Sequence, residues 1–114
     1  MPFTFVDNSA LISTTEYSLV NNSTTLASST EDALLQTWVD WGGMSTENQY
    51  RIQITEQVQD ALSSISPVME ATFTGAQPGP FAAPTVLVGN GWDVRVTLLA
   101  GPVRLIRWSL RKIT

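Results

Sequence analysis

Short runs of alternating apolar and polar residues, separated by glycine, proline and asparagine, dominate the pattern of this chain. The clearest run is residues 49–58, where Tyr50, Ile52 and Ile54 alternate with polar residues. Residues 92–98 show the same period of two. Such an alternation places apolar side chains on one face of a strand and polar side chains on the other. The pattern therefore predicts strands that each bury one face.

Seven segments carry a strand signal of this kind, and turn-forming residues separate them. They are residues 14–20, 32–41, 49–58, 67–74, 85–88, 92–98 and 103–113. Short strands at this spacing predict an all-β fold, which we expect to be a single antiparallel β-sandwich or jelly-roll-like domain of about seven to eight strands. We place this domain at residues 14–114.

Two further stretches lack the alternation. Residues 1–13 contain scattered apolar side chains, and we expect them to form an irregular N-terminal arm. Residues 75–84 hold three prolines with Phe81 between them, and we expect a stiff loop there. Phe81 has two interpretations: it folds back onto its own sandwich, or it anchors the chain in a neighbouring subunit.

Two segments also fit a helix. In residues 29–43, Thr30 can serve as N-cap and Gly42 as C-cap, with acidic residues in the first turn. We favour a strand in this segment, because its Thr, Trp and Val residues favour strands. In residues 56–65, apolar residues recur at helical spacing, and we expect the end of a strand followed either by a turn or by one turn of helix.

The amino-acid composition excludes several kinds of catalytic and metal-binding site. It has 114 residues, the size of one domain, and contains no cysteine and no histidine. These absences exclude thiolate chemistry, histidine-based triads and most transition-metal sites. The ten acidic residues are scattered and form neither a catalytic carboxylate pair nor a calcium-loop pattern. We therefore predict a protein that is not an enzyme and that binds no cofactor and no metal.

Charge is distributed unevenly along the chain. All ten acidic residues precede residue 95, together with a single base, Arg51, whereas residues 95–114 contain five bases and no acid. An acidic body does not suit nucleic-acid binding, and no apolar run approaches the ~20 residues of a membrane span. We expect neither kind of partner. The basic strip either neutralises the acidic strands of its own chain or docks on an acidic partner.

Four tryptophans are candidates for the core or for binding. Trp92 and Trp108 are in phase with aliphatic neighbours, so we expect both in the core. Trp38 and Trp41 lie three residues apart and thus on opposite faces of a strand. One of them can therefore be exposed, and an exposed tryptophan is a candidate binding hot spot.

Several strand and turn segments carry a resemblance to a known group of proteins. They are Thr14-Thr15-Glu16-Tyr17-Ser18-Leu19, Asn22-Ser23-Thr24-Thr25-Leu26, Gln49-Tyr50, Gly91-Trp92-Asp93-Val94 and Trp108-Ser109-Leu110-Arg111-Lys112. Together they resemble small β-sandwich structural proteins of tailed bacteriophages, of the capsid decoration (cement) type. The resemblance implies a virion protein that binds the outer shell, stabilises it and is assembled in the bacterial host cytoplasm. The implied partner is the major capsid protein, and the implied oligomer is a dimer or trimer.

We expect partner contacts from aromatic and basic side chains outside the alternating core pattern. These residues are Phe3, Phe5, Phe81, Arg104, Arg107 and Arg111. An alternative function is a carbohydrate- or receptor-binding module of a phage tail or fibre, with Trp38 or Trp41 as its platform. A tail or connector component is a further alternative.

Overall fold

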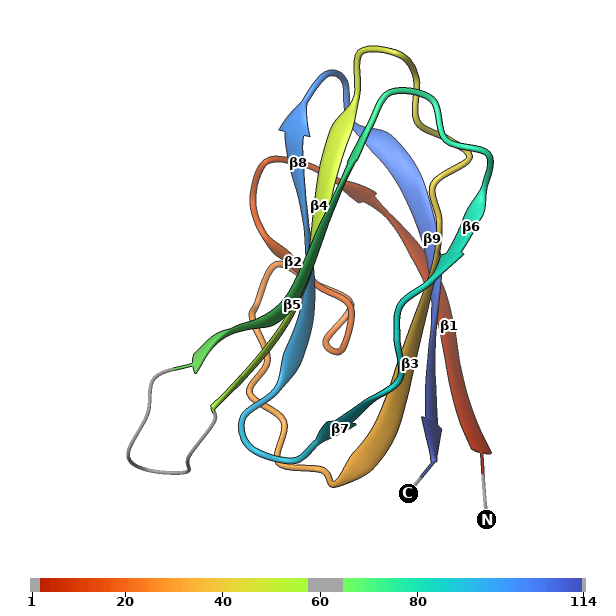
Figure 1. Ribbon diagram of the computed structural model, residues 1–114. Helices are drawn as coiled ribbons and strands as arrows, with labels where there is room; N and C mark the ends of the chain where they lie inside the picture. Colours follow the sequence, from red (N-terminus) through yellow and green to blue (C-terminus); the bar gives the residue numbers. More distant parts are fainter. Residues whose placement is uncertain (1–2, 58–64, 114) are drawn as a thin grey trace.

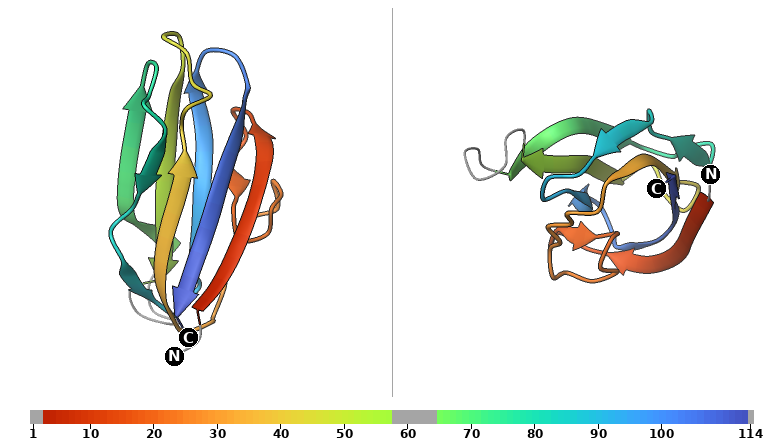
Figure 2. Two further views of the ribbon diagram at one scale, coloured as in Figure 1. Left: turned by 90° about the vertical axis from the view of Figure 1, so that its right-hand side faces the viewer. Right: turned by 90° about the horizontal axis from the view of Figure 1, so that it is seen from below.

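The computed structural model describes residues 3–57 and 65–113, and nine antiparallel strands make up most of this part of the chain (Figure 1). The strands are β1 (Phe3–Ile12), β2 (Tyr17–Ser18), β3 (Ala33–Asp40), β4 (Gln49–Gln57), β5 (Ile65–Thr74), β6 (Pro80–Ala82), β7 (Val86–Val88), β8 (Asp93–Ala100) and β9 (Arg104–Ile113). They form two sheets that pack face to face (Figure 2).

Sheet A has the strand order β1-β9-β3-β6, and β7 also pairs with β3. The short strands β6 and β7 occupy successive halves of one edge of β3. At the other edge, β1 pairs with β9 along its whole length, from Phe3 opposite Ile113 to Ile12 opposite Arg104. Sheet B has the order β2-β8-β4-β5.

This architecture confirms the predicted all-β sandwich. The two strands beyond the seven predicted ones are β1 and β6, which lie in segments without alternation. The expectation of an irregular arm is wrong, because residues 3–12 form a regular strand of sheet A. Pairing of strands needs only backbone N–H and C=O groups, so β9 can hold a segment whose side chains are mostly exposed. Likewise, Phe81 belongs to β6 and not to a free loop.

The other predicted strands are present with shifted ends. Residues 32–41 form β3, so the strand interpretation of this segment is confirmed over the helix. The predicted strand at residues 14–20 shrinks to Tyr17–Ser18. In the ambiguous segment 56–65, β4 runs to Gln57 and β5 begins at Ile65, while residues 58–64 lie outside the described part of the chain.

The core fills the space between the sheets with side chains from alternate strand positions. Trp41, Trp92 and Trp108 are buried, which confirms the core placement predicted for the latter two. An aromatic row runs through one side of the core: ring centroids are 4.8 Å apart from Phe81 to Phe73 and 4.9 Å apart from Phe73 to Trp41. Phe81 thus folds back onto its own sandwich.

Tyr50 joins the two sheets by hydrogen bonds as well as by packing. Its side chain is completely buried. The hydroxyl donates to the carbonyl oxygen of Ile12 (2.7 Å) and accepts from the backbone N–H of Arg104 (3.0 Å). Burial raises the pKa of Tyr50 above its ordinary value, and the hydrogen bond and positive charge of Arg104 partly oppose this.

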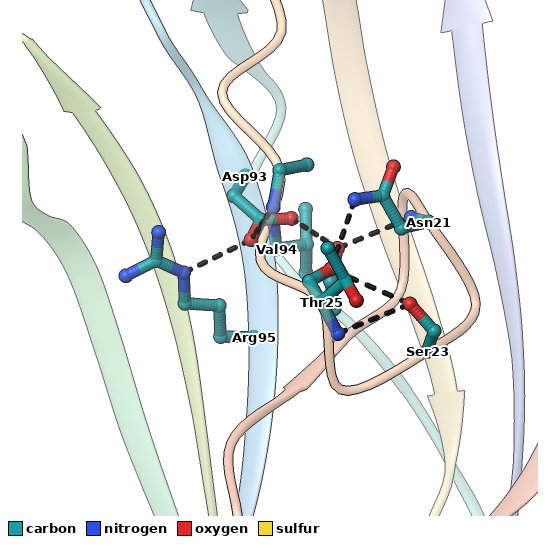
Figure 3. A network of polar contacts seen from close by, with 8 residues as sticks. Asn21, Ser23, Thr25, Asp93, Val94 and Arg95 are labelled. Atoms are coloured by element: carbon teal, nitrogen blue, oxygen red, sulfur yellow. Dashed lines mark hydrogen bonds and ion pairs between the residues drawn. The ribbon is translucent and has the colours of Figure 1, made fainter.

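A buried carboxylate holds the long connection between β2 and β3 against sheet B (Figure 3). Asp93 is completely buried and accepts hydrogen bonds from Ser18 Oγ (2.7 Å), Ala27 N (3.0 Å) and Val94 N (2.8 Å). Arg95 Nε donates a fourth at 2.9 Å and supplies the opposite charge. A buried charge is tolerated when it is paired and fully hydrogen-bonded in this way.

Candidate functional site

The outer face of sheet A collects most of the side chains that we expected to bind a partner. Because Ile106, Trp108 and Leu110 point into the core, the alternate residues of β9 point outward. The register places Phe5 of β1 and Gln36 of β3 on either side of Arg111. We call this outward surface face A. Its members are Phe3, Phe5, Asp7, Leu34, Gln36, Trp38, Asp40, Arg107, Ser109, Arg111 and Ile113.

At the centre of face A, the Arg111 guanidinium is stacked between two aromatic rings. Its Cζ lies 4.9 Å from the ring centroid of Phe5 and 4.4 Å from that of Trp38. The two rings come from the strands on opposite sides of β9, so pairing with both strands is required to build the stack. A guanidinium over an aromatic face gains about 0.5–1 kcal/mol at an exposed site.

The side chains of the stack are further oriented by hydrogen bonds. Arg111 Nε donates to Ser109 Oγ at 3.3 Å, and Trp38 Nε1 donates to Gln36 Oε1 at 2.8 Å. The terminal nitrogens of Arg111 form no hydrogen bond or ion pair with the described residues. A guanidinium held flat with free terminal N–H groups matches the two oxygens of a carboxylate.

Two shallow hollows flank the stack, and Arg111 lines both of them. The first is mainly apolar; it is lined by Phe3, Phe5, Leu34, Gln36, Thr85, Arg111 and Ile113. The second has more charged side chains in its lining, which includes Asp7, Trp38, Asp40, Pro80, Arg107 and Ser109. Face A therefore offers an apolar contact area next to a charged one, with the cation between them.

The aromatic residues of face A are unusually open to solvent. The exposed fraction is 67% for Phe3 and 55% for Phe5, and nearby Leu87 on β7 reaches 78%. Leu34, paired with Leu87 and with Ile113, extends this apolar area across β3. Clustered exposed apolar side chains of this kind mark interaction surfaces more often than inert ones.

The six predicted partner-binding residues separate into two groups. Phe3, Phe5, Arg107 and Arg111 come together on face A. Phe81 packs inside the sandwich, as described above. Arg104 lies at the far end of β9, where Nε donates to Asn48 Oδ1 (2.9 Å) and Nη2 donates to Ser45 Oγ (3.0 Å), so its charged end contacts its own chain.

From β3, the sequence predicted one exposed tryptophan but not its position beside Arg111. Of the two candidate tryptophans, Trp41 is 1% exposed and Trp38 is the partly exposed one. Gln36 and Leu34 share its face because they precede it by two and four residues in the same strand. That spacing was visible in the chain, but the partner strand that brings Arg111 beside Trp38 was not.

Two of the five bases in the basic strip form ion pairs within the described residues. Arg95 pairs with Asp93 at 2.9 Å, and Lys112 pairs with Glu31 at 2.7 Å. Arg107 has no ion pair or hydrogen bond within the described residues, and Arg111 has only its Ser109 contact and the two rings. Self-neutralisation is thus confirmed for Arg95 and Lys112, whereas docking on an acidic partner stays a prediction for Arg107 and Arg111.

Among residues 3–57 and 65–113, no three histidine, cysteine, aspartate or glutamate side chains cluster closely enough to hold a metal ion. The same part of the chain contains no helix long and apolar enough to cross a bilayer.

Comparisons with known proteins inform the fold and no more. No family model and no curated protein sequence matches this chain. A crystal structure of the Yersinia pseudotuberculosis-derived mitogen is similar in fold, with a TM-score of 0.56 over 94% of this chain and 84% of that chain. The two sequences are 9% identical. At this identity the likeness concerns the β-sandwich alone.

Proposed function

We propose that this chain is a non-enzymatic virion structural protein, of the phage decoration type, that binds the major capsid protein through face A and stabilises the shell. One observation supports this most directly: the Arg111 guanidinium is stacked between Phe5 and Trp38 beside an exposed apolar area, and its terminal nitrogens have no partner among the described residues. Aromatic residues and arginine are the types that dominate protein–protein hot spots.

The chemistry of the partner surface follows from that of face A. Arg107 and Arg111 suit carboxylates on the partner, and Phe3 and Phe5 suit an apolar area beside them. Because the chain as a whole is acidic, with a formal net charge of −4, contact with an acidic shell relies on this local arrangement and not on overall attraction. A protein that binds only the assembled shell stabilises it by mass action.

Two measurements test the proposal. Quantitative mass spectrometry of particles from the source organism gives the copy number of the chain. A number close to that of the major capsid protein supports the decoration role, a handful per particle indicates the tail or a fibre, and absence from particles refutes a virion role.

Binding to particles that lack the protein then tests face A. Because β1 is part of sheet A, substitutions are more informative than removal of residues 1–12. We expect R111A and F5A to lower the affinity at least ten-fold. The matched control is R51A, which removes the same side chain from the outer side of sheet B and should bind normally. Equal binding by R111A and R51A would contradict the role of face A.

A carbohydrate- or receptor-binding module is the second candidate, and the partial exposure of Trp38 favours it. Arg107 and Asp40 line the hollow beside the indole and could hydrogen-bond to a sugar. However, Arg111 already covers one side of the ring at 4.4 Å, so a sugar has less of the indole available. Titration with a glycan, followed by tryptophan fluorescence, tests this candidate. Quenching in the natural chain that disappears in W38F would favour it over the decoration role.

A further inference from the structure

Strand β1 leaves one edge of sheet A open. In the part of the chain that the structure describes, no strand pairs with its outer side, and β1 is the outermost strand where sheet A faces the viewer (Figure 2, left). The strand is ten residues long and mostly exposed, and its pairing with β9 runs without a bulge. Its one charged residue is Asp7. Such an edge is a template for another strand.

The other long edge of the sandwich is protected. Strand β5 closes sheet B on one side and is also ten residues long. It contains Pro67, and its ladder with β4 has an irregularity between Ile54 and Thr55. Proline and bulges are the usual means of blocking an edge against further pairing. The chain thus carries these features on β5 and lacks them on β1.

Hydrogen bonds indicate which backbone groups of β1 face the open edge. The Ser9 N–H donates to Asn8 Oδ1 (3.0 Å), a contact available to a group that points away from β9. At the end of the strand, Tyr50 bridges Ile12 C=O and Arg104 N–H, so the backbone of Ile12 faces β9. Because the direction alternates from residue to residue, the odd-numbered residues from 3 to 11 direct their backbone groups outward. A second extended strand can pair with a row of this kind.

The residue pattern of β1 is complementary to itself in one antiparallel register. With a two-fold axis at Asn8, Phe5 lies opposite Leu11 of the second copy, and Asp7 lies opposite Ser9 of the second copy. Val6 then faces Ala10 on the inner side. An axis one residue away, at Asp7, would set two carboxylates opposite each other, which is unfavourable. An axis at Val6 would place Phe5 against Asp7.

We propose that two copies of this chain associate through β1, antiparallel about a two-fold axis at Asn8, so that their A sheets merge into one continuous sheet. Pairing would bring Phe5 beside Leu11 of the second copy and so cover part of two side chains that are 55% and 68% exposed in the single chain. The symmetry makes each apolar and polar contact occur twice, as in isologous dimers generally.

The dimer would also place two copies of face A on the same side. In an antiparallel pair, residues directly opposite each other share a face, and Phe5 and Leu11 both point outward. Two linked faces bind a repeating surface more tightly than one. The dimer itself does not depend on the proposed function, since its bonds come from β1 alone.

Proline substitution at the open edge tests the pairing. S9P removes an N–H that does not take part in the ladder with β9 and places a ring where the second strand would lie. We expect sedimentation velocity over a concentration series to show a dimer for the natural chain and at least ten-fold weaker association for S9P. The circular dichroism spectrum should stay the same. A natural chain that remains monomeric throughout, or an S9P variant that dimerises equally well, would overturn the proposal.

Disulfide trapping tests the register, because the chain contains no cysteine of its own. N8C places two thiols across the axis in a pair whose Cβ atoms lie about 4.5–5.5 Å apart, close to the disulfide range. The matched control is T4C, also exposed on the same strand, whose two copies would lie about 27 Å apart in this register. We expect rapid oxidative dimerisation of N8C, loss of it in N8C/S9P, and little for T4C. Faster trapping of T4C or V6C than of N8C would refute the axis at Asn8.

Discussion

Arg51 and Arg111 occupy outward positions on opposite sheets, and their surroundings differ. Arg51 Nε lies 3.8 Å from Glu70 Oε1, and the same carboxylate oxygen accepts a hydrogen bond from Gln53. Arg111 instead lies between two rings with its terminal nitrogens free of partners among the described residues. On the outer side of sheet B the arginine thus has a carboxylate partner, whereas on face A the terminal nitrogens of Arg111 have none among the described residues.

The same contrast holds at the edges and near the connections. On sheet B, Asp93 holds the β2–β3 connection in place, and Pro67 interrupts the edge strand β5. On sheet A, the edge strand β1 is continuous and exposed. Groups that already have partners within the chain gain little by binding elsewhere, since a new bond only replaces an old one. We therefore expect substitutions on sheet B to affect stability and substitutions on face A to affect binding.

The largest effect on stability should come from Asp93. D93A leaves Ser18 Oγ, Ala27 N and the Arg95 guanidinium without their buried acceptor. Removing one partner of a buried, charged network costs about 3–5 kcal/mol, which we expect in urea unfolding. The control E70A removes a partly exposed carboxylate from the same sheet and should cost no more than about 1 kcal/mol. A loss below that of E70A would contradict the structural role of the network.

We expect a smaller loss of stability from a substitution of Tyr50, which joins the two sheets. Y50F keeps the packing of the buried ring but leaves Ile12 C=O and Arg104 N–H without the hydroxyl that joins them. Unsatisfied buried backbone groups of this kind cost about 1–3 kcal/mol. Urea unfolding at neutral pH measures the loss. An unchanged free energy of unfolding would mean that water replaces the hydroxyl at no cost.

Alkaline pH should weaken the fold through the same residue. Burial raises the folded-state pKa of Tyr50 above the value of about 10 expected for an unfolded chain. The unfolded state therefore loses its proton first as the pH rises. The stabilising contribution of the protonated side chain is fully present below pH of about 10 and declines as the pH rises through the folded-state pKa. Urea midpoints measured from pH 8 to 11 should fall less steeply for Y50F than for the natural chain, and equal slopes would contradict this origin.

The smallest stability effect should belong to the centre of face A. R111A removes two cation–π contacts, each worth about 0.5–1 kcal/mol at an exposed site. The wavelength of the tryptophan fluorescence maximum should nevertheless shift, because the guanidinium no longer covers the ring of Trp38. The control R51A should leave the tryptophan spectrum unchanged. Destabilisation by R111A as large as that of D93A would show that face A is structural and not a free binding surface.

The alternation of apolar and polar residues predicted those strands that have one face against the core and the other face directed outward. In β4, buried Ile52 and Ile54 flank the outward-facing Gln53, so the period of two was plain. At the start of β1 the pattern is inverted: Phe3 and Phe5 point outward, while Thr4 lies on the inward side. No local rule identifies a strand whose apolar residues are exposed, which is why the segment was predicted as an irregular arm.

The site was predictable in its residue types but not in its assembly. Phe5 and Arg111 are separated by most of the chain, and only the pairing of β1 with β9 sets them opposite each other. Arg104 and Arg107 look alike in the sequence, yet one contacts Asn48 and the other has no partner within the described residues. The position of each along β9 decides which neighbours it meets.

The sequence by itself determined the fold class, because the period of two in the hydrophobic pattern is a local property that survives in any arrangement of the strands. It also determined which reactive side chains are absent, histidine and cysteine above all. Tertiary structure decided which strands are neighbours, and therefore that Arg111 lies between Phe5 and Trp38 and that β1 keeps an open edge. These features depend on backbone pairing between distant segments, in which any extended stretch can take part.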